Sequence, residues 1–97
     1  MPIQMRIYTI NRGALDDFAA AWKKTIKPLR EKLGFTIPAA WTLPSTNQFV
    51  WLMQYDGPES WEDLDQTYFS HPDRLAMSPD PARHIARMEE YFMNPVT

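Results

Sequence analysis

The polar and apolar positions at the start of the chain predict a strand followed by a long helix. QMRIYTI, residues 4–10, alternates between two sets of side chains as strands do, and it ends at the turn-forming residues 11–13. Apolar residues then recur three or four positions apart, which is the helical period. They are Leu15, Phe18, Trp22, Ile26, Leu29 and Leu33. Pro28 lacks a backbone donor and predicts a kink near Thr25, and Gly34 is placed to end this helix.

The middle of the chain predicts two more strands and a second helix. Residues 35–43 have strand character, and Pro38 predicts that this strand lies at an edge or is bulged. FVWLMQY, residues 49–55, is rich in β-branched and aromatic residues and lies between two clusters of turn formers. Ser60 resembles the cap of a helix over residues 61–71, which should end there because a proline follows.

The local pattern leaves the tail open between two structures. Asp80 resembles a helix cap, and Ile85, Met88 and Phe92 have helical spacing. The alternative is a short helix followed by a strand over RMEEYFM, residues 87–93. Taken alone, the local pattern favours the helix.

The order of elements predicts an α+β fold. Strand, helix, strand, strand and helix, completed by a fourth strand, give the ferredoxin-like βαββαβ arrangement, an antiparallel four-stranded sheet with both helices on one face. The third strand is apolar on both sides, and branched Val50 and Leu52 are expected to face the helices. The opposite face is then expected to carry Arg6, Tyr8, Trp51, Met53 and Tyr55. Because no element is left to cover that face, a homodimer is expected to bury it.

Composition and charge narrow the classes of function. The chain has 97 residues, which fit one domain over 1–97, and no cysteine, which suits a reducing cytoplasm. Residues 23–32 are rich in Lys and Arg, and residues 56–65 are rich in Asp and Glu, so the two helices should attract each other. The net charge of −2 argues against a nucleic-acid partner. Neither a membrane span nor an export signal is recognised, so a cytoplasmic protein is expected.

The chain resembles the NIPSNAP family over nearly its whole length. Its opening, QMRIYTINRGALDDF, carries the recurrent residues Arg6, Tyr8, Gly13 and Phe18. Further matching residues follow in order: Trp41, Asn47, Tyr55, Asp56, Glu89 and Pro95. The resemblance implies a dimeric α+β barrel, a superfamily shared with antibiotic-biosynthesis and haem-degrading monooxygenases, and it implies that the tail is a strand. Where the family's second helix often starts with an arginine, this chain has Trp61 or Glu62.

Few residues are candidates for chemistry. His71 is a weak candidate for a catalytic base or ligand, because histidine titrates near neutral pH, but a structural hydrogen bond is the alternative. His84 is weaker still, and no spacing of a metal site is present. Glu89 or Glu90 should reach Arg6 across the fourth strand, either to orient a ligand or to fix the dimer register. The predicted ligand-binding residues are Arg6, Tyr8, Trp51, Tyr55 and Glu89.

These residues favour binding of a small apolar or aromatic molecule in or beside a dimeric barrel, with no cofactor. One alternative is a small monooxygenase, either cofactor-independent, with the substrate supplying the electrons, or haem-dependent. The other is a purely structural or interaction dimer with a filled barrel.

Overall fold

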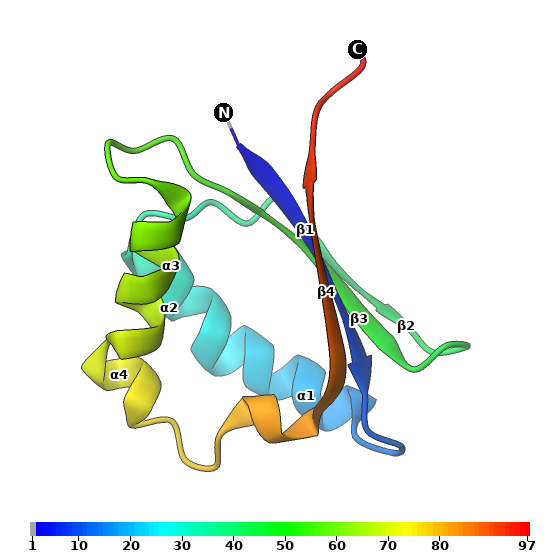
Figure 1. The fold of residues 1–97 in the computed structure, drawn as a ribbon. Coiled ribbons are helices and arrows are strands. Elements are labelled where there is room, and N and C mark those ends of the chain that lie inside the picture. The colour runs from blue at the N-terminus through cyan, green and yellow to red at the C-terminus, as the bar shows by residue number, and fades with distance from the viewer. Residues whose placement is uncertain (1) are drawn as a thin grey trace.

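The computed structural model describes residues 2–97, and in it the helices gather on one side of a single sheet (Figure 1). The strands are β1 (Ile3–Ile10), β2 (Ala40–Leu43), β3 (Gln48–Gln54) and β4 (Ile85–Met93). The helical segments are α1 (Leu15–Ala21), the π-helical η1 (Trp22–Ile26), α2 (Lys27–Lys32), α3 (Trp61–Ser70), α4 (Pro72–Leu75) and the 3-10 turn η2 (Pro81–His84).

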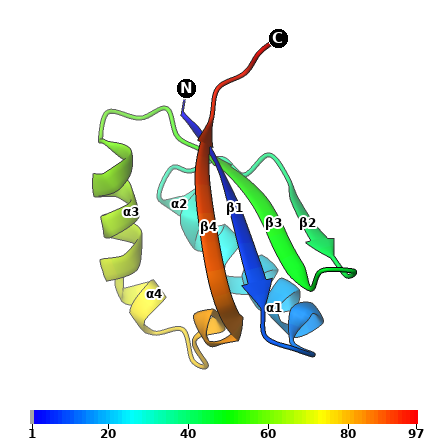
Figure 2. The ribbon, with the colours of Figure 1, turned by 45° about the vertical axis from the view of Figure 1, so that its right-hand side comes forward.

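The sheet has the predicted topology. Its strand order is β2-β3-β1-β4, and every neighbouring pair is antiparallel. The α+β, ferredoxin-like fold is therefore confirmed. Pro38 does mark an edge strand, since regular pairing of β2 begins only at Ala40 and Thr36 makes an isolated bridge to Gln54. Viewed from the face without helices, α1 and α2 lie behind the strands and α3 stands beside the β4 edge (Figure 2).

The tail is a strand, as the family resemblance implied, and the helix favoured by the local pattern is wrong. Only Pro81–His84 form a helical turn before β4 begins. β4 pairs with β1 along its length, with Arg6 opposite Glu90 and Tyr8 opposite Met88. A long antiparallel ladder is a tertiary contact that local spacing does not encode, and it outweighs the weak helical pattern.

The first helix is irregular where Pro28 predicts. Five residues before α2, Trp22–Ile26, form a π-helical segment, and Pro28 then lies in the first turn of α2. Proline removes one backbone bond and crowds the preceding turn, and a wider turn accommodates both effects. The Thr25 hydroxyl donates to the Ala21 carbonyl at 2.6 Å. Gly34 follows the helix with a φ of 109°, which favours glycine.

The assignment of the two sheet faces is wrong in the sequence-based prediction. Trp51, Met53 and Tyr55 do share a face with Arg6 and Tyr8, but this face lies under the helices. Val50 and Leu52 are half-buried on the opposite, outer face. The reason is size, because large rings fill the space under the helices: the ring centroid of Trp22 lies 5.4 Å from that of Trp51 and 5.0 Å from that of Phe49.

Candidate functional site

Arg6 is a charged residue in the middle of the inner sheet face. The side chain is 1% exposed because β1 is a central strand of the sheet and the helices cover it. Its Nε donates to Oε1 of Gln4 at 2.7 Å, and its Nη2 donates to Oδ1 of Asp65 at 3.2 Å. Nη2 also lies 3.6 Å from Oε2 of Glu90, the residue opposite Arg6 on β4. Arg6 thus connects two strands to α3.

Arg30 reaches the same carboxylate from the other side. It lies in α2, is 1% exposed, and donates from Nη1 to Oδ1 of Asp65 at 2.6 Å. Its guanidinium carbon lies 3.6 Å from the ring centroid of Tyr68, a cation–π contact. Its Nε is buried and has no hydrogen-bond partner among residues 2–97. Arg30 therefore has a single carboxylate, which it shares with Arg6.

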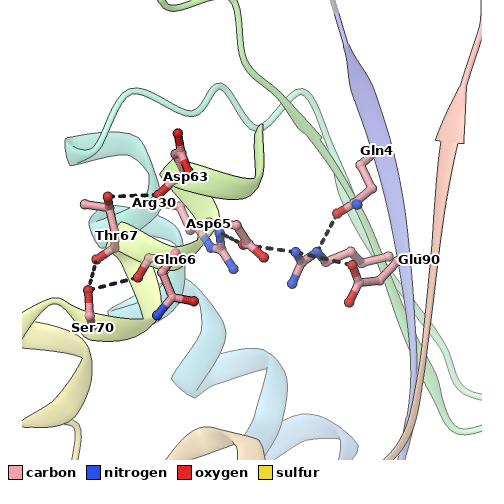
Figure 3. Close-up of polar contacts among 9 residues, drawn as sticks. Gln4, Arg30, Asp63, Asp65, Gln66, Thr67, Ser70 and Glu90 are labelled. Carbon is pink, nitrogen blue, oxygen red and sulfur yellow. Dashed lines mark hydrogen bonds and ion pairs between the residues drawn. The ribbon is translucent and has the colours of Figure 1, made fainter. Parts of the chain in front are cut away.

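Asp65 is placed between these two arginines by α3. The helix is capped by Ser60, whose hydroxyl accepts the backbone N–H of Asp63 at 3.1 Å. Leu64 and Tyr68 anchor the inner face of α3, and Asp65 is the neighbouring position on that face. Figure 3 shows Asp65 pointing from α3 toward the sheet, with Arg30 on one side and Gln4 and Glu90 on the strands beyond. One ion pair, Arg30 with Asp65, joins the basic first helix to the acidic second helix, although Arg30 is buried and not part of a solvated face as expected.

The two arginines have different electrostatic environments, because Arg6 contacts two carboxylates and Arg30 contacts one. Burial disfavours the charged form of Arg6, but Tyr8 and the two carboxylates outweigh burial, so the pKa of Arg6 is raised. Burial and the positive charge of Arg6 lower the pKa of Arg30, although Asp65 opposes them. Burial also raises the pKa of Tyr68. Both arginines stay protonated near neutral pH, and Arg30 is the less compensated charge.

A small cavity lies next to these side chains. Its volume is about 40 Å³, and it lies between the sheet, the helices and the 3-10 turn η2. It is lined by Arg6, Tyr8, Ile26, Arg30, Tyr68, Phe69, Arg74, Ala82, Ile85 and Met88. Three guanidinium groups thus line one cavity together with two tyrosines. The described residues 2–97 contain no group of three acidic or histidine side chains placed to hold a metal ion.

The family model for NIPSNAP matches residues 3–97. The chain belongs to the NIPSNAP family. The solved structures similar to this NIPSNAP chain include an uncharacterized NIPSNAP domain protein from Burkholderia xenovorans, with a TM-score of 0.83, 21% identity and coverage of 98% of this chain and 94% of the other. A NIPSNAP family protein from Agrobacterium tumefaciens has a TM-score of 0.85 at 12% identity, covering 97% and 91%. An antibiotic biosynthesis monooxygenase has a TM-score of 0.70 at 11% identity, covering 100% of both chains. No curated protein matches significantly.

Two of the predicted ligand-binding residues of this NIPSNAP chain line the cavity, and three do not. Arg6 and Tyr8 line the cavity. Trp51 does not line it but contacts Arg6, with its ring centroid 5.8 Å from the guanidinium carbon of Arg6. Tyr55 instead donates a hydrogen bond to a carboxylate oxygen of Glu59. Glu89 lies on the outer face, where it accepts bonds from Arg87 and Tyr91 at 2.7 Å each. Of the two glutamates considered for Arg6, Glu90 makes the contact.

The candidate histidine, His71, makes a hydrogen bond that caps a helix. The ring nitrogen Nδ1 of His71 accepts the backbone N–H of Asp73 at 3.0 Å and so caps α4. This is the structural alternative to a catalytic role. His71 is not among the residues that line the cavity.

Sequence reasoning missed Arg30, Asp65 and Tyr68 as members of one site. A signal for them was present in the helical periodicity. Arg30 lies four positions after Ile26, and Asp65 lies four positions after Trp61, so both charges fall within the apolar stripes of their helices. A charged residue within each of two facing stripes predicts a buried ion pair between the helices.

Proposed function

We propose that this NIPSNAP protein binds a small, largely apolar molecule in the space between the sheet and the helices. The supporting observation is the cavity of about 40 Å³ that two fully buried arginines and two tyrosines line. Buried charges are costly, and their concentration around an internal cavity is typical of binding sites. The apolar body of the ligand reaches the cavity between α3 and β4.

The proposal includes a homodimer in which the outer faces of two sheets pack together, the arrangement that the family resemblance implies. The outer face carries half-buried Met5 and Ile7 and more exposed aromatic side chains, including Trp41 at 51%. Large apolar side chains gathered on one uncovered sheet face are typical of an interface between subunits. A cytoplasmic location, which the cysteine-free sequence suggests, belongs to the same proposal. None of the helices within residues 2–97 is long and apolar enough to cross a bilayer.

Methionine-methyl NMR tests the binding site directly. A set of aromatic and aliphatic fragments is added to protein labelled at its methionine methyl groups. The signal of Met88, which lines the cavity, should shift, and that of Met5 on the outer face should not. If no fragment shifts Met88, or if shifts concentrate on the outer face, the proposed cavity site is wrong and the structural dimer remains.

Cofactor-independent oxygenation is a second candidate at the same site. The observation in its favour is the pair of buried guanidinium groups next to Tyr8 and Tyr68, because cations in a dry site stabilise an organic substrate in its anionic form. The similarity to an antibiotic biosynthesis monooxygenase concerns the fold. Oxygen uptake with a panel of electron-rich phenols tests this candidate, and uptake unaffected by Arg30→Gln would contradict the assigned site.

A further inference from the structure

We propose that the ligand of this cavity is a monocarboxylic acid with an apolar body, and that Arg30 and Arg74 hold its carboxylate. This inference rests on the proposed function and specifies the chemical class of the ligand.

The first argument is the distribution of charge around the cavity. Three arginines line it, whereas the carboxylates that pair with them, Asp65, Glu90 and Asp80, are not among its lining residues. The Nε atoms of both Arg30 and Arg74 are buried and have no hydrogen-bond partner among residues 2–97. A buried N–H without a partner is unfavourable, and a bound anion satisfies it.

The second argument is the arrangement of the two guanidinium groups. The guanidinium carbons of Arg30 and Arg74 lie 3.6 Å and 5.9 Å from the ring centroid of Tyr68. Both side chains therefore meet around one aromatic ring at the cavity wall. Guanidinium groups match planar carboxylates with parallel hydrogen bonds, a geometry that a lysine ammonium lacks.

The third argument is size. A water molecule occupies about 30 Å³ of liquid, so a cavity of about 40 Å³ accommodates a group of one to a few heavy atoms. Phe69 of α3 and Met88 of β4 both line the cavity and are 42% and 43% exposed, so we place its opening between them. Phe92, exposed on the same β4 edge, packs against Trp61 with ring centroids 5.1 Å apart. The carboxylate fits inside, and the apolar body lies across this rim.

Paired ligands test the inference without any mutation. Benzoate, 4-phenylbutyrate and octanoate are titrated into the protein by calorimetry beside their uncharged amides. At least one acid should bind about tenfold or more tightly than its amide, because a hydrogen bond to a charged group is stronger than one to a neutral group. Amides that bind as well as the acids would overturn the carboxylate assignment and leave the cavity site standing. If neither series binds, the inference is wrong, and the methionine-methyl experiment decides the proposed function separately.

Substitutions of the arginines identify which side chains bind the carboxylate. Arg30→Gln and Arg74→Gln should each weaken acid binding about tenfold or more and weaken amide binding much less. Arg30→Lys should restore only part of the affinity, since it keeps the charge and loses the planar geometry.

Lys23→Gln removes one positive charge from the exposed side of the same helical run and should have no effect. Equal losses in Lys23→Gln and Arg30→Gln would show general attraction and overturn the assignment. Because Arg74 is less buried than Arg30, its variant tests the site even if Arg30→Gln fails to fold.

Discussion

The two faces of the sheet each depart from the usual placement of polar and apolar groups. Beneath the helices, the inner face buries Gln4 and Arg6 among aromatic residues. The outer face, which no helix covers in Figure 2, carries Met5, Ile7 and Leu52 along its central strands. An antiparallel sheet with one covered face normally places its polar residues on the open side. Here the chain buries two polar residues beneath the helices and leaves apolar side chains of the two central strands where water has access.

This difference assigns separate roles to the faces. Removing a guanidinium group from water costs several kcal/mol in general, and for Arg30 only part of this cost returns through the carboxylate of Asp65, which Arg6 shares. A well-packed apolar group in place of Arg30 would avoid that cost, so the inner face is better suited to binding than to stability alone. In the proposed homodimer, the second subunit covers the outer face. Substitutions of neighbouring residues on opposite faces should therefore have different consequences.

The largest effects should come from introducing lysine on either face of β3. Met53 is 0% exposed under the helices, so Met53→Lys should destabilise the monomer by about 4 kcal/mol or more through a lost core contact and a buried charge. Leu52→Lys, one residue earlier on the outer face, should leave the monomer folded and prevent dimerisation. Chemical denaturation and light scattering measure the two outcomes.

The wild-type protein provides the reference for this comparison. It should be a dimer at micromolar concentration. A monomeric wild type, or a Leu52→Lys variant that remains a dimer, would remove the outer face as the interface.

Removing the shared carboxylate should have the next largest effect. Asp65→Ala leaves the buried Arg6 and Arg30 to repel each other, and breaking a buried pair costs about 3 to 5 kcal/mol in general. Asp65 is partly exposed, so about 2 to 3 kcal/mol is expected, measured as a shift of the urea midpoint. Glu62→Ala, in the same helix but exposed, is the matched control and should change stability by less than about 0.5 kcal/mol. Equal losses in the two variants would contradict a central role for Asp65.

Shortening an aromatic residue of the outer face should weaken the dimer without unfolding the monomer. Trp41 lies on β2 beside Val50 and is half-exposed in the single chain, so Trp41→Ala costs the monomer little. At an interface, loss of a tryptophan typically costs about 1 to 3 kcal/mol, which raises the dimer Kd about tenfold to a hundredfold. Sedimentation at several concentrations measures this change. Leu75→Ala on α4 removes a still more exposed apolar residue away from the outer face, and it should leave the Kd unchanged.

The sequence determines the elements of this fold better than it determines which face they cover. Pro28, Pro38 and the Ser60 cap act locally, and the structure has the kink, the edge strand and the helix start where they predict. The faces of β3 could not be assigned locally, because both are apolar and the choice depends on how much space the helices leave. The cavity depends on Arg30, Asp65 and the strand β4, which are distant in sequence. The tail strand, too, is defined by its pairing with β1.

The smallest effects should come from removing the tyrosine hydroxyl from two tyrosine–glutamate pairs, one on each face of the sheet. Tyr55 of the inner face donates to Glu59, and Tyr91 of the outer face donates to Glu89. The bond from Tyr55 lowers the pKa of Glu59, and the bonds from Tyr91 and Arg87 lower the pKa of Glu89. A carboxyl group whose pKa is lowered by folding stabilises the protein above its unfolded pKa, and this contribution is lost as the pH falls through the folded pKa.

Tyr55→Phe and Tyr91→Phe should therefore each reduce the loss of stability below about pH 4.5, the ordinary range of a glutamate. At pH 7, each variant should lose only the stabilisation from one hydrogen bond. The two variants should differ in their dependence on protein concentration. The Tyr55 pair lies within one chain, between the end of β3 and the loop before α3, so its effect should be the same at every concentration. The Tyr91 pair lies on the outer face, so its effect should grow with concentration as dimers form. Thermal unfolding between pH 3 and pH 7 at two protein concentrations measures both, and a concentration-independent effect of Tyr91→Phe would place β4 outside the interface.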